Sequence, residues 1–219
     1  DACIVSEPSE GNLILAHKGF VWIEIETQGE AAHGSRWELG VSAMGRMRRI
    51  AAAIENFDRK VLRANVHPLL GPASMHCATI MGGEGWSTYA PRCTMRIERR
   101  TLPGENAETV ERELKAIIDE AGESATLSVV LARSPLECDA NSPIAHAVRA
   151  AAASVNGQEP PVAGVAYWMD AAIFVDAGVS TVDFGPTGTG AHAAEEWVDL
   201  ESVVRCAQVL ERAAREFLS

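Results

Sequence analysis

The sequence predicts an α/β protein into which a separate α+β domain is inserted. Strand-like and helix-like segments alternate along the 219 residues without a repeat or a long linker. The middle of the chain follows the order β-α-β-β-α-β. This order is typical of a ferredoxin-like domain, in which two helices cover one face of a four-stranded antiparallel sheet. We therefore expect an α/β segment at 1–19, a ferredoxin-like domain at 20–134 and the rest of the α/β layer at 135–219.

Hydrophobic periodicity places each element of the middle domain. Val21, Ile23 and Ile25 alternate with polar or larger residues, which predicts a half-covered strand over 20–27. The helix expected over 40–57 has apolar residues on one face, and these are Met44, Met47, Ile50, Ala51 and Ile54. The remaining elements are expected as strands at 77–81 and 93–98, a helix at 106–121 and a strand at 127–132.

The two flanking segments read as parts of one α/β layer. A short apolar strand is expected at 2–5, followed by a loop. After the middle domain we expect helices at 143–155, 170–176 and 200–218 and strands at 162–166 and 180–184. The inner side of the last helix should hold Val203, Val204, Val209, Leu210 and Ala214. This tail is consistent with part of a parallel sheet covered on both faces. Because a strand opens the chain without an initiator methionine, we expect the chain to be the remainder of a longer protein.

Composition excludes several classes of function. With 19 Lys and Arg against 30 Asp and Glu, the net charge is −11 and no basic stripe is present, which argues against nucleic-acid binding. No apolar stretch approaches the roughly 20 residues that span a bilayer, and no signal peptide is recognisable, so no membrane partner is expected. The five cysteines have no metal-binding spacing and are odd in number, which favours reduced thiols and a cytoplasmic location.

Two residues after apolar strands are candidates for metal binding. Glu7 follows the first strand, and the carboxyl ends of strands in α/β sheets are where ligands bind. It is a candidate metal ligand or base, and the alternative is a turn cap beside Pro8. His192 lies in a glycine-rich loop after the strand at 180–184, where Glu195 or Glu196 could orient its imidazole. The alternative is an exposed loop histidine.

Two residues of the middle domain are candidates for substrate contact. His33 lies among small residues in the loop after the first strand, and a histidine there could donate a hydrogen bond to a developing oxyanion. Arg100 could present its planar guanidinium to a substrate carboxylate. The alternatives are a turn histidine and a surface arginine. The other histidines fit no group and are interpreted as structural or surface residues: His17, His67, His76 and His146.

Four motifs occur in an order that resembles a known family. They are IVSEP at 4–8, TQGEAAHGS at 27–35, ERRTLPGE at 98–105, and GAH at 190–192 followed by Glu196. Together they are similar to the M20 family of metal-dependent hydrolases, which includes deacetylases, desuccinylases, aminoacylases and carboxypeptidases. The resemblance runs along almost the whole chain. It implies that 20–134 is a lid and dimerisation domain and that 1–19 and 135–219 belong to a zinc-hydrolase catalytic domain.

The resemblance also implies a role for each candidate residue. Glu7 would bind one zinc and His192 the other, with Co²⁺ or Mn²⁺ as alternative metals. His33 would polarise the scissile carbonyl, usually in the active site of the partner subunit of a homodimer. Arg100 would hold the substrate carboxylate, and Ser87 and Thr88 stand at a substrate-contact position where several relatives have asparagine. The implied chemistry is attack of a metal-bridging hydroxide on the amide of an N-acyl amino acid or small peptide.

The chain departs from this family in one respect. The His-x-Asp pair, the bridging Asp and the Glu-Glu pair of the family's N-terminal half are absent from residues 1–219. A catalytic zinc normally has three protein ligands, and this chain offers one candidate for each metal. We therefore expect the isolated chain to be inactive without the missing N-terminal half. The alternative is a non-catalytic dimerisation or interaction module that retains a relic of the hydrolase fold, and a small-molecule-sensing domain is a weaker third hypothesis.

Overall fold

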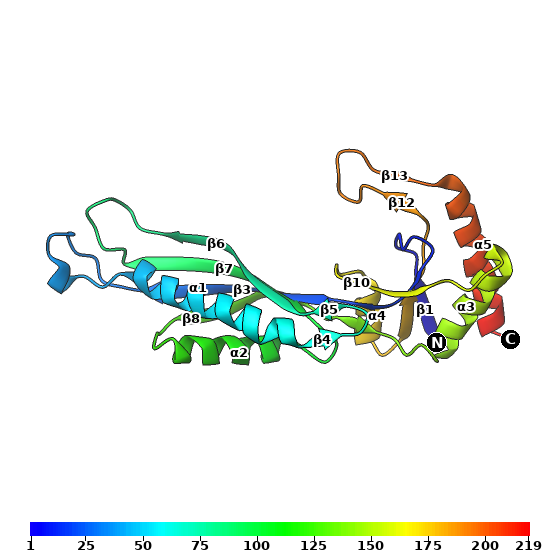
Figure 1. The fold of residues 1–219 in the computed structure, drawn as a ribbon, viewed down its shortest axis with the longest axis horizontal. Coiled ribbons are helices and arrows are strands. Elements are labelled where there is room, and N and C mark those ends of the chain that lie inside the picture. Colours follow the sequence, from blue (N-terminus) through cyan, green and yellow to red (C-terminus); the bar gives the residue numbers. More distant parts are fainter. The chain divides into compact units, whose positions relative to one another are not determined.

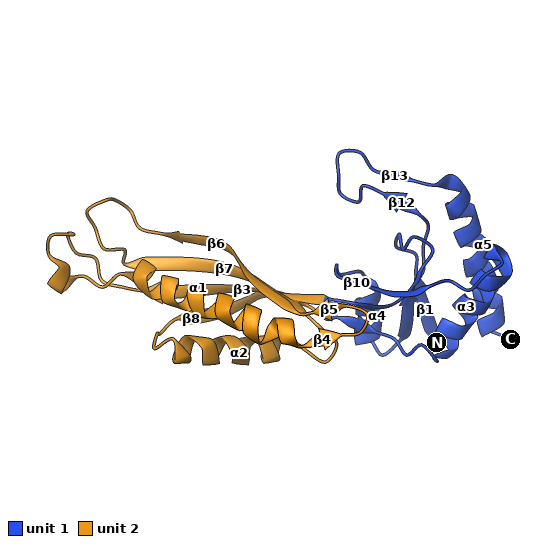
Figure 2. Cartoon of the chain, in the orientation of Figure 1, with its two compact units in different colours: residues 1–18, 134–219 blue, residues 19–133 orange.

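The computed structural model describes residues 1–219, and the chain forms two compact units (Figure 2). Unit 1 consists of Asp1–Lys18 and Ser134–Ser219, and unit 2 is the intervening segment Gly19–Arg133. The fold is thus a mixed α/β unit interrupted by an α+β unit, as the sequence predicted. Each unit has its own sheet and its own helices.

Unit 2 is an antiparallel sheet with strand order β6-β7-β3-β8 and two long helices on one face (Figure 1). Its elements are β3 (Gly19–Gln28), the 3₁₀ helix η1 (Trp37–Leu39), α1 (Ala43–Lys60), the 3₁₀ helix η2 (Leu62–Ala64), β4 (Val66–His67), β5 (Gly71–Pro72), β6 (Ser74–Gly82), β7 (Arg92–Thr101), α2 (Ala107–Glu120) and β8 (Thr126–Arg133). The main elements appear in the predicted β-α-β-β-α-β order. The short β4–β5 hairpin and the two 3₁₀ helices were not predicted.

Alternation along the two central strands builds the core of unit 2. β3 and β7 pair so that Ile23 faces Ile97 and Ile25 faces Met95, and all four side chains are buried. The same alternation turns Arg99 toward the helices, where its side chain is fully buried. The neighbouring Arg100 consequently belongs to the opposite face of the sheet.

The helices of unit 2 begin at side-chain caps. The Ser42 hydroxyl accepts the backbone N–H of Gly45 at 3.0 Å, and the Asn106 side chain accepts that of Thr109 at 2.8 Å. The cap at Ser42 explains why α1 begins at Ala43, three residues later than predicted. Met44, expected on the buried face of this helix, lies in its first turn and is exposed.

Unit 1 contains a five-stranded sheet in which β1, β11, β2 and β10 are neighbours in that order and β9 also pairs with β2. Its elements are β1 (Ala2–Val5), β2 (Leu13–His17), β9 (Leu136–Glu137), α3 (Pro143–Asn156), β10 (Val162–Val165), α4 (Ala171–Asp176), β11 (Ser180–Asp183), β12 (Gly188–Thr189), β13 (Trp197–Val198) and α5 (Leu200–Phe217). The tail was expected to be part of a parallel sheet, and the sheet that it joins is mixed. β1 is parallel to β11 and β10 to β2, but β2 runs antiparallel to β11 and to β9.

Strand β2 was also missed by the sequence analysis. All five of its residues are buried, so it shows no alternation between apolar and polar positions. The segment LILAH has the length of a fully buried strand but no period that would separate it from a buried piece of helix. Its central place in the sheet nevertheless makes it the strand around which unit 1 is assembled.

Helices cover both faces of this sheet. Leu13, Leu15, Val182 and Phe184 form one core cluster with α3 and α5, whereas Val5 packs with the smaller cluster of Leu136 and α4. The prediction for the inner side of α5 was partly wrong. Val203, Val204 and Ala214 are exposed, and the buried residues are Ser202, Cys206, Val209 and Ala213. These four follow the helical period, and the apolar pair at 203 and 204 lies beside their stripe.

Candidate functional site

Glu7 lies in the loop that leaves the carboxyl end of β1, and it is half-buried. The backbone of this loop packs directly on Gly185. A Cβ at Gly185 would overlap the carbonyl oxygen of Glu7, so only glycine fits there. Ser9 fixes the same contact, since its hydroxyl accepts the Gly185 N–H at 2.9 Å. The position of Glu7 is therefore tied to the segment that follows β11.

Asp183 is the buried carboxylate beside this loop, and the sequence analysis did not identify it. It ends β11 next to Val5 of the parallel strand β1, and it is fully buried. Neither carboxylate oxygen has a hydrogen-bond partner. Burial, together with the negative charges of Glu7 and Asp170, raises the pKa of Asp183 to about 7. The position of Asp183 at the end of a predicted strand could have identified it. Parallel strands end at one edge of a sheet, so a carboxylate at the end of a parallel strand lies near Glu7.

His17, interpreted from the sequence as an ordinary structural histidine, is a second buried polar residue of unit 1. Its side chain is fully buried, and burial lowers the pKa of the imidazole. Nδ1 lies 3.2 Å from the carbonyl oxygen of Lys18, and Nε2 has no hydrogen-bond partner. The ring meets Trp168 edge-on, with 6.4 Å between centroids.

His192 lies in the turn between β12 and β13, and it is exposed. Its φ of +62° is in the left-handed region, which non-glycine residues rarely adopt. The turn is tight, because a Cβ at Gly190 would overlap the carbonyl oxygen of Glu195. Glu196, like Glu195, is exposed, and neither makes a hydrogen bond or ion pair with His192.

A complete metal centre is not present in this chain. No group of three or more His, Cys, Asp or Glu side chains in residues 1–219 is arranged to hold a metal ion. A carboxylate and an imidazole are ligand types that zinc accepts, but a catalytic site needs about three protein ligands. The chemistry of Glu7 and His192 thus fits zinc, and their number does not.

In unit 2, the structure brings together His33, Ser87 and Thr88. Two loops are joined there by backbone hydrogen bonds, from Gly34 N–H to the Ser87 carbonyl at 2.7 Å and from Tyr89 N–H to the Ala32 carbonyl at 2.9 Å. His33 and Thr88 face each other as an isolated β-bridge. The side chains of His33, Ser87 and Thr88 are exposed.

The hydrogen bonds of His33 define its tautomer. Its Nδ1 accepts the backbone N–H of Ser35 at 3.2 Å and lies 2.8 Å from the Ser35 hydroxyl. An N–H donor can only be accepted by an unprotonated nitrogen, so in the neutral ring the proton is on Nε2. His33 therefore presents a fixed hydrogen-bond donor to solvent.

Arg100 lies on the open face of the unit 2 sheet, at the opposite end from His33. Its guanidinium is 3.0 Å from Glu98 and 5.5 Å from the centre of the Phe20 ring. Phe20 and Arg100 pair near the beginning of β3, whereas His33 follows the end of that strand. Phe20 and Gln28 are eight steps apart along this extended strand, which corresponds to roughly 26 Å. Within one subunit, these two candidates do not face the same substrate.

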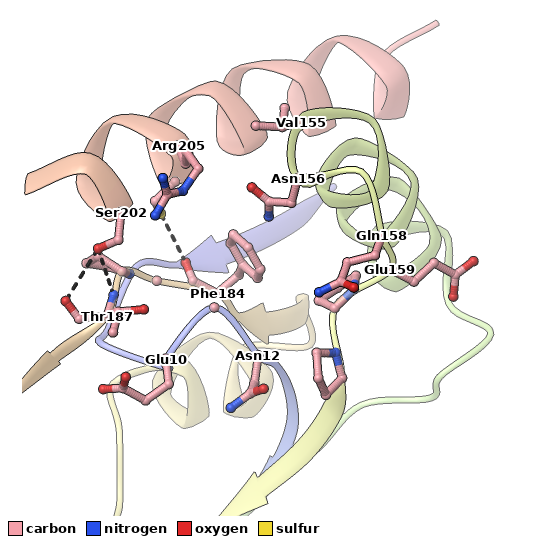
Figure 3. Close-up of a pocket in the computed structure, with 16 residues that line it drawn as sticks. Glu10, Asn12, Val155, Asn156, Gln158, Glu159, Phe184, Thr187, Ser202 and Arg205 are labelled. Carbon is pink, nitrogen blue, oxygen red and sulfur yellow. Dashed lines mark hydrogen bonds between the residues drawn. The ribbon is translucent and has the colours of Figure 1, made fainter. Parts of the chain in front are cut away.

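Unit 1 also contains a cavity of about 560 Å³ beside the loop of Glu7 (Figure 3). Its walls come from the loop at 10–12, the end of α3, the segment after β11 and the first turns of α5. The lining combines charged, amide and apolar side chains, among them Glu10, Asn12, Asn156, Gln158, Phe184 and Arg205. The sequence analysis gave no indication of this cavity.

The chain thus combines an α/β layer with an inserted antiparallel α+β unit, and Glu7 follows β1 whereas His192 follows β11. A family model described as the peptidase dimerisation domain of the M20 peptidases matches residues 15–126, about half of the chain. The chain belongs to this M20 family of hydrolases, and its dimerisation domain lies within unit 2 and the adjoining part of unit 1.

Relatives and solved structures agree with this assignment. The chain is 29% identical to an acetylornithine deacetylase of Myxococcus xanthus over 98% of its own length, and 24% identical to one of Vibrio cholerae over 99%. It is similar in fold to the aminopeptidase PepT of Bacillus cereus ATCC 10987, with a TM-score of 0.80 and 17% identity over 98% of this chain and 56% of that one. An M20 metallo-carboxypeptidase of Sulfolobus solfataricus gives a TM-score of 0.72 at 14% identity, over 99% of this chain and 68% of that one.

The chain spans little more than half the length of these curated relatives, 57% of the Myxococcus xanthus protein and 58% of that from Vibrio cholerae. In addition, none of its helices has the length and apolar character needed to cross a membrane. All five cysteines are free thiols.

Proposed function

We propose that this chain is part of a metal-dependent amidohydrolase that cleaves an N-acyl amino acid or a small peptide. The observation that carries the proposal is the match to acetylornithine deacetylases along 98% of the chain. The protein is proposed to be cytoplasmic, which its five free thiols support.

In this proposal Glu7 and His192 each contribute one ligand to a two-zinc site, in which Co²⁺ or Mn²⁺ are alternatives. The remaining ligands and the general base come from residues outside this chain, because residues 1–219 contain no group of three candidate ligands. Bound zinc would supply a water of lowered pKa and stabilise negative charge on the reacting carbonyl oxygen. The isolated chain is accordingly expected to hydrolyse nothing.

His33 is proposed to polarise the scissile carbonyl. Its Nε2 proton is fixed by the two contacts of Nδ1 with Ser35, so the ring needs no tautomeric change before it donates a hydrogen bond. Ser87 and Thr88 are proposed to contact the substrate beside it, since the two loops are hydrogen-bonded to each other.

Arg100 is proposed to bind the substrate carboxylate. It already pairs with Glu98 at 3.0 Å and stacks on Phe20, which together orient the guanidinium. Because His33 lies at the far end of the same sheet, both residues can act on one substrate only if they come from different subunits. This supports a homodimer formed through unit 2, in which His33 enters the site of the partner subunit.

The alternative is an interaction module that keeps the dimerisation domain and only a relic of the active site. The matched dimerisation domain and the exposure of His192 are the observations that favour it. The two proposals differ in one measurable property. Only the hydrolase proposal requires amide cleavage when the missing half is supplied.

The test is reconstitution with an N-terminal half. The chain is mixed with the N-terminal half of the Myxococcus xanthus acetylornithine deacetylase, association is checked by size-exclusion chromatography, and hydrolysis of N-acetyl-L-ornithine is measured with and without Zn²⁺. Zinc-dependent hydrolysis supports the hydrolase proposal. A stable complex without activity favours the interaction module.

Two variants of the reconstituted protein separate the proposed roles. His192→Ala is expected to lower the bound metal, measured by elemental analysis, and to abolish turnover. His33→Ala is expected to retain the metal and to lower kcat by roughly 10²–10³-fold, the usual loss for one oxyanion donor. His76→Ala, an exposed histidine on β6, is the matched control and should change neither quantity. Metal loss in His33→Ala would contradict the assignment.

A further inference from the structure

The cavity of unit 1 is lined by one guanidinium, that of Arg205, and by the carboxylates of Glu10 and Glu159, of which Glu159 already faces Arg149 at 3.8 Å (Figure 3). Arg205 reaches it from α5 and Glu10 from the loop after β1, with Phe184 between them. Arg205 has one ion-pair partner, Glu201, at 3.4 Å, and this glutamate is largely exposed. Glu10 accepts the Gly188 N–H through Oε1, which leaves its other oxygen without a hydrogen bond. The guanidinium of Arg205 and the carboxylate of Glu10 can thus each bind a further partner.

Three amide side chains also belong to the polar lining, beside Thr187 and Ser202. Asn12, Asn156 and Gln158 come from three separate segments and border the same cavity. None of them makes a side-chain hydrogen bond within the protein. Each amide offers both a donor and an acceptor, so together they can pair with either end of a small polar molecule.

The backbone of Glu10 is strained in the conformation that places it here. Its φ is +56°, and His192 is the only other non-glycine residue of the chain with a positive φ. The surrounding loop holds this conformation, because Ser9 bonds to Gly185 and the Gly11 N–H donates to the Gly185 carbonyl at 3.2 Å. Strained residues of this kind persist where the neighbouring structure fixes them, and they cluster at ligand sites.

The volume of the cavity and the apolar part of its lining restrict the kind of ligand that fits. Its volume, about 560 Å³, is in the ordinary range of about 300–1,000 Å³ for small-molecule pockets. Val155, Pro161 and Pro186 supply accessible apolar surface, whereas Phe184 and Pro160 are buried behind it. A ligand that satisfies all of these features has a cationic end, an anionic end and an apolar body.

We propose that this cavity binds a small zwitterion with a free amino group and a free carboxylate, an amino acid or a dipeptide. Its carboxylate pairs with Arg205, its ammonium group with Glu10, and its side chain contacts Val155 and Pro161. The occupied cavity also braces the loop of Glu7, because Gly185 is in contact with both the cavity and the Glu7 backbone. The binding site is formed within unit 1 and does not depend on the hydrolase proposal.

Calorimetric titration of the 219-residue chain tests the proposal. The probes are L-leucine and L-leucylglycine, each compared with N-acetyl-L-leucine, which lacks the ammonium group, and L-leucinamide, which lacks the carboxylate. We expect at least one zwitterion to bind and both blocked compounds to bind about tenfold more weakly or worse, the loss expected for one charge-assisted contact. Equal binding of the blocked compounds, or no binding of either zwitterion, overturns the proposal.

Variants locate the site. Arg205→Gln and Glu10→Gln are each expected to weaken binding about tenfold. Arg215→Gln is the matched control, since Arg215 is on the same helix and forms the same kind of i,i+4 pair, with Glu211 at 2.8 Å, outside this cavity. Unchanged affinity in both cavity variants overturns the proposal. Circular dichroism verifies folding, and if one cavity variant is unfolded, the other together with the blocked compounds decides the outcome.

Discussion

Each unit contains a fully buried ionisable side chain, and these two side chains differ in whether they have a partner. In unit 2 the guanidinium of Arg99 is 2.8 Å from Glu105 and 3.4 Å from Glu113, and it also donates to the Arg100 carbonyl at 2.6 Å. In unit 1 the carboxylate of Asp183 is equally buried and has no hydrogen-bond partner on either oxygen. Its charged neighbours, Glu7 and Asp170, are of the same sign.

The paired Arg99 is typical of a structural residue, whereas the unpaired Asp183 is typical of a functional site. A buried charge without a partner is unfavourable, whereas one held by opposite charges and hydrogen bonds is tolerated. Unit 2 therefore compensates its internal charge, although burial still raises the pKa of Glu113. Unit 1 holds a buried carboxyl group without a partner at the strand edge where Glu7 lies, and its raised pKa of about 7 keeps it largely protonated below neutral pH. Strongly shifted carboxyl groups of this kind cluster at functional sites.

The largest effect is expected from removing the guanidinium of unit 2. Arg99→Met leaves Glu105 and Glu113 as uncompensated, largely buried carboxylates, so the free energy of unfolding should fall by about 3–5 kcal/mol in urea titrations. Arg96→Met is the control, because Arg96 pairs with Glu24 on the exposed face and its loss should cost about 0–1 kcal/mol. Adding Glu105→Gln and Glu113→Gln to Arg99→Met should recover part of the loss. Equal costs for the two single variants would remove the contrast between the units.

The next effect concerns Asp183 and depends on pH. Its pKa is raised from 3.8 to about 7, so the folded state binds the proton more tightly than the unfolded state and stability falls as pH rises from about 4 to about 7. Asp183→Asn removes this dependence. The stability of the variant relative to the native chain should therefore increase between pH 4 and pH 8, by an amount on the order of 3 kcal/mol.

Urea titrations at four pH values with EDTA present measure this difference. Asp176→Asn, an exposed carboxylate at the end of α4, is the control and should show no comparable trend. A difference that stays constant across the pH range would mean that Asp183 has a partner in solution.

A smaller effect is expected where the Glu7 loop meets Gly185. Gly185→Ala must displace the Glu7 carbonyl, so we expect a loss of about 1–3 kcal/mol in stability. Gly85→Ala is the control in unit 2, because a Cβ there meets nothing within 4 Å and φ is not in the left-handed region. A neutral Gly185→Ala would show that the Glu7 loop moves freely, contrary to the coupling inferred from the contact.

These comparisons also show what the sequence could predict. The order of the elements in unit 2 was predictable because its strands have one buried and one exposed face, as the alternation of Val21, Ile23 and Ile25 shows. β2 was not, because burial on every side removes that alternation. The antiparallel pairing of β2 with β11 has no local signal either, since it depends on tertiary contacts.

The candidate residues likewise divide into those that the sequence revealed and those that it did not. Glu7, His33, Arg100 and His192 were found because they lie in motifs of small residues, proline or glycine. Asp183 lies outside these motifs, and Arg99 was not singled out although it stands beside Arg100 in the motif at 98–105. Their importance comes from burial, which is a property of the folded chain. The strand register places His33 and Arg100 at opposite ends of one sheet. This arrangement could not be predicted from the sequence either.

The smallest predicted effect tests whether the two units differ only in their buried charges. Each has a helix capped by a serine, Ser42 in unit 2 accepting from Gly45 at 3.0 Å and Ser142 in unit 1 accepting from Ala145 at 3.3 Å. Ser42→Ala and Ser142→Ala should each cost about 1 kcal/mol, measured by amide hydrogen exchange in α1 and α3. Similar costs would mean that local structure is built alike in both units and that the contrast lies in the pairing of buried charges. A much larger cost for Ser142→Ala would instead mean that α3, and with it the core of unit 1, is only marginally stable in this chain.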